Sequence, residues 1–138
     1  MTPLRNKGNV IRTANGYIGQ INIEGVIMDI NATFWDGKKY KCDLWIQRIK
    51  EKKYDELNNK FIDYTPKPFL QCFANKLKKK DTFDYKGNFI FVGFKYDLIA
   101  WWEDKTEHQL NISVERSKSQ PILERLNKIK KDNHEIIK

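Results

Sequence analysis

The sequence predicts an all-β fold, a small β-barrel with a minor helical part. Apolar and polar residues alternate over several segments, with the period of half-buried strands. The alternation slips by one position at Gly25, a pattern typical of a β-bulge that bends a strand. Asp36-Gly37 then separates two alternating segments and is a strong signal for a hairpin turn.

The first two strands are predicted on either side of this turn. Residues 1–16 are polar and glycine-containing, so we expect a flexible N-terminal arm there. Residues 17–36 then form one long strand, bent at Gly25. Residues 38–50 form the second strand, in which one face is apolar and the other carries charges and Trp45. The apolar face consists of Tyr40, Cys42, Leu44 and Ile46, and the other of Lys39, Lys41, Asp43, Trp45 and Gln47.

The second half of the chain predicts three more strands and two helices. The charged residues 51–67 form a long loop or an extended hairpin tip. The elements expected after them are a strand at 69–75, about two helical turns within 76–85, a strand at 88–102, a turn at 103–107 and a strand at 109–115. Residues 121–131 are predicted to form a short amphipathic helix, because apolar residues recur there at helical spacing after the potential cap Ser119.

Five strands with a short helix between the third and the fourth follow the order of an OB-fold, a five-stranded Greek-key barrel. Another small β-barrel of similar size is the alternative. We therefore expect a flexible arm at 1–16, an OB-fold domain at 17–117, and a C-terminal helix with a basic tail at 118–138. The sequence shows neither an internal repeat nor a second domain.

The composition favours a globular protein with a polyanionic partner. Of the 138 residues 40% are hydrophobic and 32% are charged, and the net charge is +8. Basic residues that neutralise phosphates release condensed counterions, so this excess suits nucleic acid. A solvated lysine-rich surface explains the same excess. The aromatic content of 13% includes four tryptophans, more than one small core usually needs.

The sequence carries no pattern typical of catalysis, of a metal site or of a membrane span. Cys42 and Cys72 are far apart and predict reduced core thiols rather than zinc ligands. The aspartates are scattered, and neither a phosphate-binding loop nor a nucleophile motif occurs. We expect no enzyme activity and no cofactor. No apolar stretch reaches the roughly 18 residues that a membrane span needs, so a soluble, cytoplasmic protein is expected.

Three segments are similar to a known family. Residues 21–29 resemble its first strand, 69–77 its third strand running into a helix, and 85–93 its helix end and fourth strand. In this order they resemble the single-stranded DNA-binding (SSB) proteins over residues 18–117. The C-terminal residues 132–138 lack the acidic tip that is usual in that family. The resemblance therefore implies an atypical member, of a kind that suits a phage, a plasmid or a mobile element.

The resemblance places base-stacking aromatic residues on the second and third strands, on the strand 4–5 hairpin and in the strand 1–2 loop. Those regions hold Trp45, Phe73, Trp101, Trp102 and Trp35. Each has a structural alternative: Phe73 also suits the core, Trp35 also suits a cover over the barrel end, and only one of Trp101 and Trp102 points outward. The cations predicted to contact phosphates are Lys39, Lys41, Arg48, Lys76, Lys78 and Lys79. Alternation puts Lys39 and Lys41 on the face of Trp45, whereas the run at Lys78 also suits a solvated surface.

The expected function is therefore to coat single-stranded DNA in replication or recombination, with base stacking on aromatic rings and Lys/Arg contacts to phosphates. The resemblance also implies a homo-oligomer, a dimer or a tetramer. Two alternatives stay open. One is a structural OB-fold subunit that docks on a replication or telomere-type complex through its C-terminal helix, and the other is an RNA-binding OB-fold protein.

Overall fold

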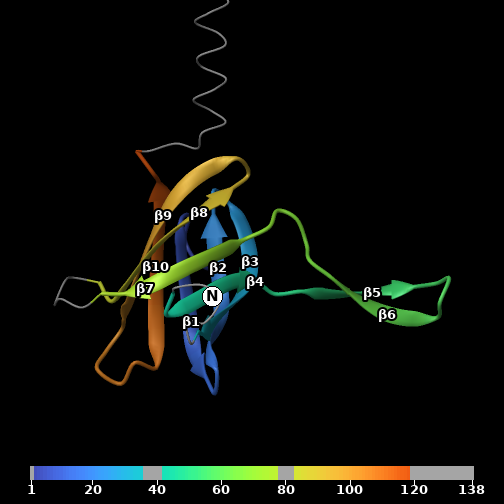
Figure 1. Ribbon diagram of the computed structural model, residues 1–138, viewed down its shortest axis with the longest axis horizontal. Coiled ribbons are helices and arrows are strands. Elements are labelled where there is room, and N and C mark those ends of the chain that lie inside the picture. The colour runs from blue at the N-terminus through green and yellow to red at the C-terminus, as the bar shows by residue number, and fades with distance from the viewer. Residues whose placement is uncertain (1, 36–41, 78–82, 119–138) are drawn as a thin grey trace, which may run out of the picture.

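The computed structural model describes residues 2–35, 42–77 and 83–118, and in these ranges the protein is all-β (Figure 1). Its strands are β1 (Lys7–Thr13), β2 (Gly16–Ile23), β3 (Val26–Phe34), β4 (Leu44–Arg48), β5 (Glu51–Asp55), β6 (Lys60–Tyr64), β7 (Gln71–Lys76), β8 (Tyr85–Phe91), β9 (Phe94–Trp102) and β10 (Gln109–Arg116). Eight of them close into a barrel in the order β1-β10-β9-β8-β7-β4-β3-β2, and β5 and β6 form a separate two-stranded sheet. The predicted all-β barrel is confirmed.

The connectivity differs from the predicted five-stranded Greek key. Every barrel strand pairs antiparallel with the barrel strands that precede and follow it, and β10 returns to β1 to close the sheet. A Greek key needs a long connection that places a strand beside a more distant one, so this barrel is an up-and-down meander. Of the segment 76–85, where about two helical turns were expected, Lys76 ends β7 and Tyr85 begins β8, and residues 78–82 lie outside the described residues. The helix predicted at 121–131 lies outside them as well.

Two long strands predicted from the sequence, at 17–36 and 88–102, are hairpins in the structure, formed by β2–β3 and by β8–β9. The β2–β3 turn is formed by Glu24 and Gly25, with φ of 52° and 90°. The β8–β9 turn is formed by Val92 and Gly93, with φ of 49° and 81°. Two central residues with positive φ are the mark of a type I′ turn. The residues that flank such a turn, for example Ile23 and Val26, are three apart in sequence but lie opposite each other on the same face. The alternation of apolar and polar residues along the sequence therefore slips by one position at the turn, as it does at a β-bulge.

Within residues 1–16, where a flexible arm was predicted, Lys7–Thr13 form a strand in the wall of the barrel. β1 pairs with β2 on one side and with β10 on the other, and Val10 is fully buried. β1 has few apolar residues, and glycines lie where it approaches β2 most closely. A Cβ on Gly19 of β2 would lie 2.1 Å from the carbonyl oxygen of Asn9 of β1, and a Cβ on Gly8 of β1 would lie 3.0 Å from the carbonyl oxygen of Gln20 of β2. This close backbone approach lets β1 pair on both sides although its own apolar signal is weak.

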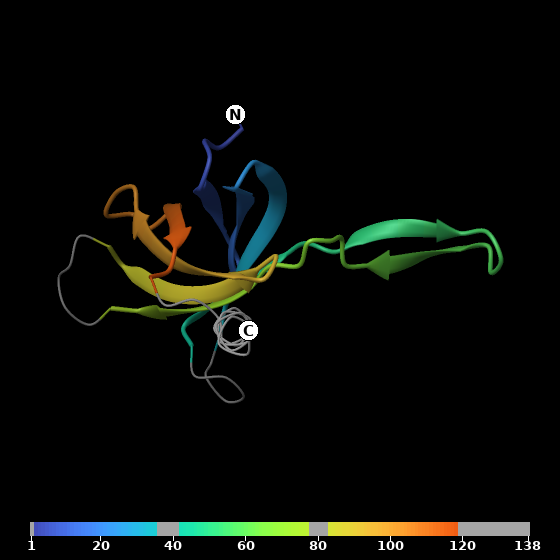
Figure 2. The ribbon, with the colours of Figure 1, turned by 90° about the horizontal axis from the view of Figure 1, so that it is seen from above.

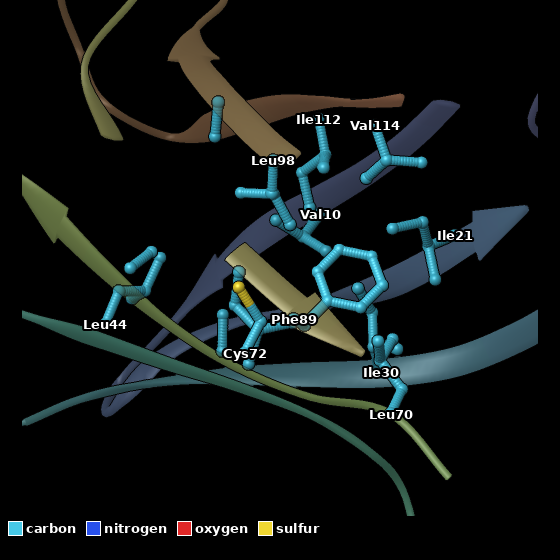
Figure 3. Packing of buried hydrophobic residues seen from close by; sticks show 14 of the residues in the cluster. Val10, Ile21, Ile30, Leu44, Leu70, Cys72, Phe89, Leu98, Ile112 and Val114 are labelled. Atoms are coloured by element: carbon cyan, nitrogen blue, oxygen red, sulfur yellow. The ribbon is translucent and has the colours of Figure 1, made fainter. Parts of the chain in front are cut away.

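Alternate residues of the eight barrel strands point inward and form one hydrophobic core (Figure 3). Cys42 and Cys72 are buried free thiols, as predicted. Burial raises the pKa of the Cys72 thiol to about 12, so this side chain stays protonated and packs as a small apolar group. The described residues contain no helix of the length and apolarity that crossing a membrane requires.

The charged segment between β4 and β7 is an extended hairpin, which was one of the two predicted possibilities. Within the described ranges β5 and β6 pair only with each other, and the ribbon projects well away from the barrel (Figures 1 and 2). We call residues 51–64 the arm. The barrel closes without it, because β4 and β7 pair directly with each other.

Candidate nucleic-acid interface

Three of the predicted aromatic residues come together on the outer face of the barrel. Trp45 of β4 lies opposite Phe73 of β7, with ring centroids 5.7 Å apart and ring planes tilted by 31°. Trp35 follows β3 and meets Trp45 edge-on, with a centroid distance of 4.8 Å and an angle of 86°. The main-chain N–H of Trp35 donates to the carbonyl oxygen of Asp43 at 3.2 Å, which holds it beside β4. We call Trp35, Trp45 and Phe73 the outer aromatic cluster.

Strand alternation fixes the outward direction of this cluster. The neighbours of Trp45 in the strand, Leu44 and Ile46, are fully buried, and so are the neighbours of Phe73 in β7. Trp45 and Phe73 themselves are only half-buried. The outward position of Trp45 is therefore confirmed, and the face of Phe73, which the sequence left open, is the same one.

Side-chain amides surround the cluster on the same face, a feature that the sequence pattern did not single out. One row of amides runs across β3, β4 and β7 and consists of Asn31, Gln47 and Gln71, which lie opposite one another. This row is two residues along the strands from Trp45 and Phe73. Asn88 of β8 lies directly opposite Phe73. Each amide can both donate and accept hydrogen bonds, as base edges require. The alternation of Gln47 with buried residues was the signal that could have indicated it.

The predicted cations are distributed differently. Arg48 has the strand parity of the buried Ile46, and its Nη1 donates to the carbonyl oxygen of Pro68 at 3.1 Å. Arg48 thus ties down the root of the arm rather than bordering the outer aromatic cluster. Lys76 ends β7, and its Nζ lies 5.2 Å from the ring centroid of Trp102. Lys39, Lys41, Lys78 and Lys79 lie outside the described residues.

Trp101 and Trp102 point in opposite directions, as alternation predicted. Trp102 packs against the end of the core, and its Nε1 donates to the hydroxyl of Tyr17 at 2.9 Å. Trp101 has the outward parity and lies opposite Asn111 of β10. Because β8 separates β9 from β7, the structure does not bring Trp101 into the outer aromatic cluster.

A second group of aromatic rings closes one end of the barrel, and it includes residues that the sequence pattern did not indicate. We call Tyr17, Phe34, Tyr85 and Trp102 the barrel-end cluster. Tyr17 meets Phe34 edge-on at 5.8 Å, and Tyr85 meets Trp102 edge-on at 5.8 Å. The guanidinium carbon of Arg12 lies 4.4 Å from the Phe34 ring centroid, a cation–π contact.

The two clusters adjoin, because the consecutive residues Phe34 and Trp35 belong to one each. Cations are held against rings of the barrel-end cluster, at Arg12 and at Lys76. Burial, followed by the nearby groups Tyr17, Glu107, Asp43 and Asp84, raises the pKa of the Tyr85 phenol to about 12. Together the clusters offer flat rings, amides and two cations held against rings, with the acidic residues Glu107, Asp43 and Asp84 near Tyr85.

Neither a metal-binding group nor a known relative adds to this description. Within 2–35, 42–77 and 83–118, no three His, Cys, Asp or Glu side chains are grouped so that they could hold a metal ion. Comparison with protein-family models, with curated proteins and with solved structures finds no match for this chain. The function is therefore inferred from the chemistry of this surface.

Proposed function

We propose that this protein binds single-stranded nucleic acid on its outer aromatic cluster. The observation that carries the proposal is the pair Trp45 and Phe73, two rings tilted by only 31° on neighbouring strands and facing outward among amides. Bases stack on such rings whatever their sequence, and each stacked base contributes about 1–3 kcal/mol. The neighbouring amides supply hydrogen bonds to exposed base edges.

Positive charge supplies the second requirement, contacts to phosphates. The chain carries 26 Lys and Arg against 18 Asp and Glu, and Arg12 and Lys76 lie at the adjoining barrel end. Lys39, Lys41, Lys78 and Lys79 stay predicted phosphate contacts. We expect binding to weaken steeply with salt, because each neutralised phosphate releases counterions.

The proposal includes the biological role implied by the likeness to SSB proteins, coating single-stranded DNA in replication or recombination. It does not need Greek-key connectivity, since adjacent antiparallel strands space Trp45 and Phe73 in the same way in a meander. RNA is the alternative polymer. Competition between oligo-dT and oligo-U at two salt concentrations distinguishes the two, with oligo-dT expected to bind more tightly.

The decisive experiment is a titration of tryptophan fluorescence with oligo-dT. We expect quenching in the wild type and binding about 5- to 150-fold weaker for Trp45→Ala or Phe73→Ala, the range that the loss of one stacked base implies. Trp45→Phe keeps a stacking ring and should restore most of the affinity. Phe61→Ala is the control, because this exposed ring lies on the arm.

Circular dichroism of each variant establishes that the barrel is intact. If Trp45→Ala and Phe73→Ala both fold and bind oligo-dT and oligo-U as tightly as the wild type, the outer aromatic cluster is not the binding surface. Truncation after Lys118 tests the alternative role as a docking subunit. Loss of a protein partner with unchanged oligo-dT binding would assign docking to the C-terminal residues.

A further inference from the structure

Among the residues that the structure describes, the arm has no strand partner in its own barrel. There β5 and β6 pair only with each other, and the ribbon extends away from the barrel in both views (Figures 1 and 2). Nearly all of its residues are exposed on both faces, including Phe61 at 68% and Leu57 at 96%. An isolated two-stranded ribbon is only marginally stable in water, so a ribbon with this much apolar surface suits a binding partner.

The charges of the arm argue against nucleic acid as that partner. Residues 51–64 contain three lysines and four acidic residues, a net charge of −1 in a chain of +8. Two of the lysines lie directly opposite acids across the ribbon, Lys52 opposite Asp63 and Lys60 opposite Asp55. The net negative charge of the arm does not attract phosphates. An apolar protein surface that carries positive charge complements the arm better.

The apolar contact points of the arm lie near its tip. Tyr54 and Phe61 form a cross-strand aromatic pair, with centroids 5.2 Å apart at 63°. Leu57 is in the connecting turn, preceded by Glu56. The carboxylate of Asp55 is already engaged, since it accepts hydrogen bonds from the main chain of Leu57 and the side chain of Asn58. Leu57 and Glu56 are thus presented at the end of the ribbon.

The barrel itself offers a complementary groove. A groove of about 560 Å³ lies over β1 and β2, and its lining includes Leu4, Ile11 and Lys7. Leu4 is 78% exposed and Ile11 is 49% exposed, while no acidic residue lines the groove in the part of the chain that the structure describes. The groove therefore combines apolar contacts with one positive charge.

The strand order puts this groove on the wall opposite the root of the arm. The arm leaves between β4 and β7, and β1 lies across the barrel from that pair. The arm also extends away from its own barrel, so its tip lies away from the β1–β2 wall (Figure 2). A second copy of the chain presents the same groove to it.

We propose that the arm tip of one copy docks in the β1–β2 groove of the next. Leu57 packs against Leu4 and Ile11, and Glu56 pairs with Lys7. Because the two surfaces lie on opposite walls, the contact is heterologous and joins copies head to tail rather than by a two-fold exchange. The proposal concerns the protein alone and does not rest on nucleic-acid binding.

The test measures self-association of the full chain without nucleic acid, by analytical ultracentrifugation over a range of concentrations. We expect concentration-dependent assembly of the wild type, weakened at least tenfold by Leu57→Asp or by Ile11→Asp. Val92→Asp, at the exposed tip of another hairpin, and Ile90→Asp, on β8, are the matched controls and should assemble as the wild type does. Leu57 lies in a turn outside the barrel, so its variant leaves the core intact.

Mixing the two variants makes the test directional. Leu57→Asp keeps a working groove and Ile11→Asp keeps a working arm, so an equimolar mixture should form 1:1 dimers at concentrations where each variant alone associates at least tenfold more weakly than the wild type. With a bismaleimide, chains carrying Leu57→Cys should cross-link to chains carrying Ile11→Cys, and not to chains carrying Ile90→Cys. A monomeric wild type, or assembly that neither Leu57→Asp nor Ile11→Asp weakens, overturns the proposal.

Discussion

Trp45 and Trp102 show how strand parity decides what an aromatic residue does in this barrel. Both are tryptophans near strand ends, but Trp45 alternates with fully buried residues and faces outward, whereas Trp102 packs on the end of the core. The sequence predicted the outward position of Trp45 from alternation alone. It could not fix Phe73, because the face of β7 is set only by the register that pairs Phe73 with Trp45.

Cys72 gives a residue-scale prediction for stability at high pH. Burial raises its pKa from the ordinary 9.0 to about 12 in the folded protein. Between these values the unfolded chain loses the thiol proton and the folded chain keeps it, so the folded state binds more protons and stability falls as pH rises. At about pH 10.5 this thiol should lower the free energy of unfolding by roughly 2 kcal/mol relative to pH 8.

Urea denaturation at the two pH values measures the effect. In Cys72→Ala the same rise in pH should cost less stability than in the wild type, although the variant is less stable at pH 8 because of the cavity that it leaves. An equal loss in both proteins would show that the Cys72 thiol is not the titrating group.

Among the elements, the short hairpins were the least visible in the sequence. Type I′ turns usually carry Asn-Gly or Asp-Gly, whereas the turns here are Glu24-Gly25 and Val92-Gly93. Glu24 is held by partners that only the fold supplies, since the Arg5 guanidinium donates to its carboxylate at 2.6 Å. The sequence does not indicate these turns, because their first residues, Glu24 and Val92, are not the Asn or Asp that usually adopts positive φ there.

Val92 leads to the prediction for this scale. It is a β-branched residue at φ 49°, a region that costs most L-residues about 1–2 kcal/mol and that Asn tolerates. Val92→Asn should therefore raise the free energy of unfolding by about 1 kcal/mol. Chemical denaturation measures this gain, and Val92→Ala, which is still strained, should give a smaller one. A destabilised Val92→Asn would contradict the turn geometry.

At the scale of the molecule, the barrel and the arm are separate sheets, joined where β4 leads into β5 and where β6 leads back to β7. The hydrophobic core lies within the closed barrel. At the root of the arm the barrel sheet is unbroken, because β4 and β7 pair directly with each other. Arg48 marks the boundary, where it donates to the Pro68 carbonyl oxygen.

Replacing residues 51–64 by Asn-Gly should therefore leave the barrel folded, with a thermal midpoint within a few degrees of the wild type. Binding of oligo-dT should be unchanged, because the outer aromatic cluster lies on the barrel, while self-association should be lost. Circular dichroism melts, fluorescence titration and ultracentrifugation measure the three properties. An unfolded product would show that the arm belongs to the folding unit.

The sequence by itself determined the all-β class, the buried cysteines, the strand at 109–115 and the outward face of Trp45, because each depends on local alternation of apolar and polar residues. Only the tertiary structure decided the eight-stranded meander, the place of β1 as a wall and the meeting of Trp35 and Phe73 around Trp45. These depend on which strands pair and in what register. That choice is set by hydrogen bonds and packing between distant segments, which local periodicity does not encode.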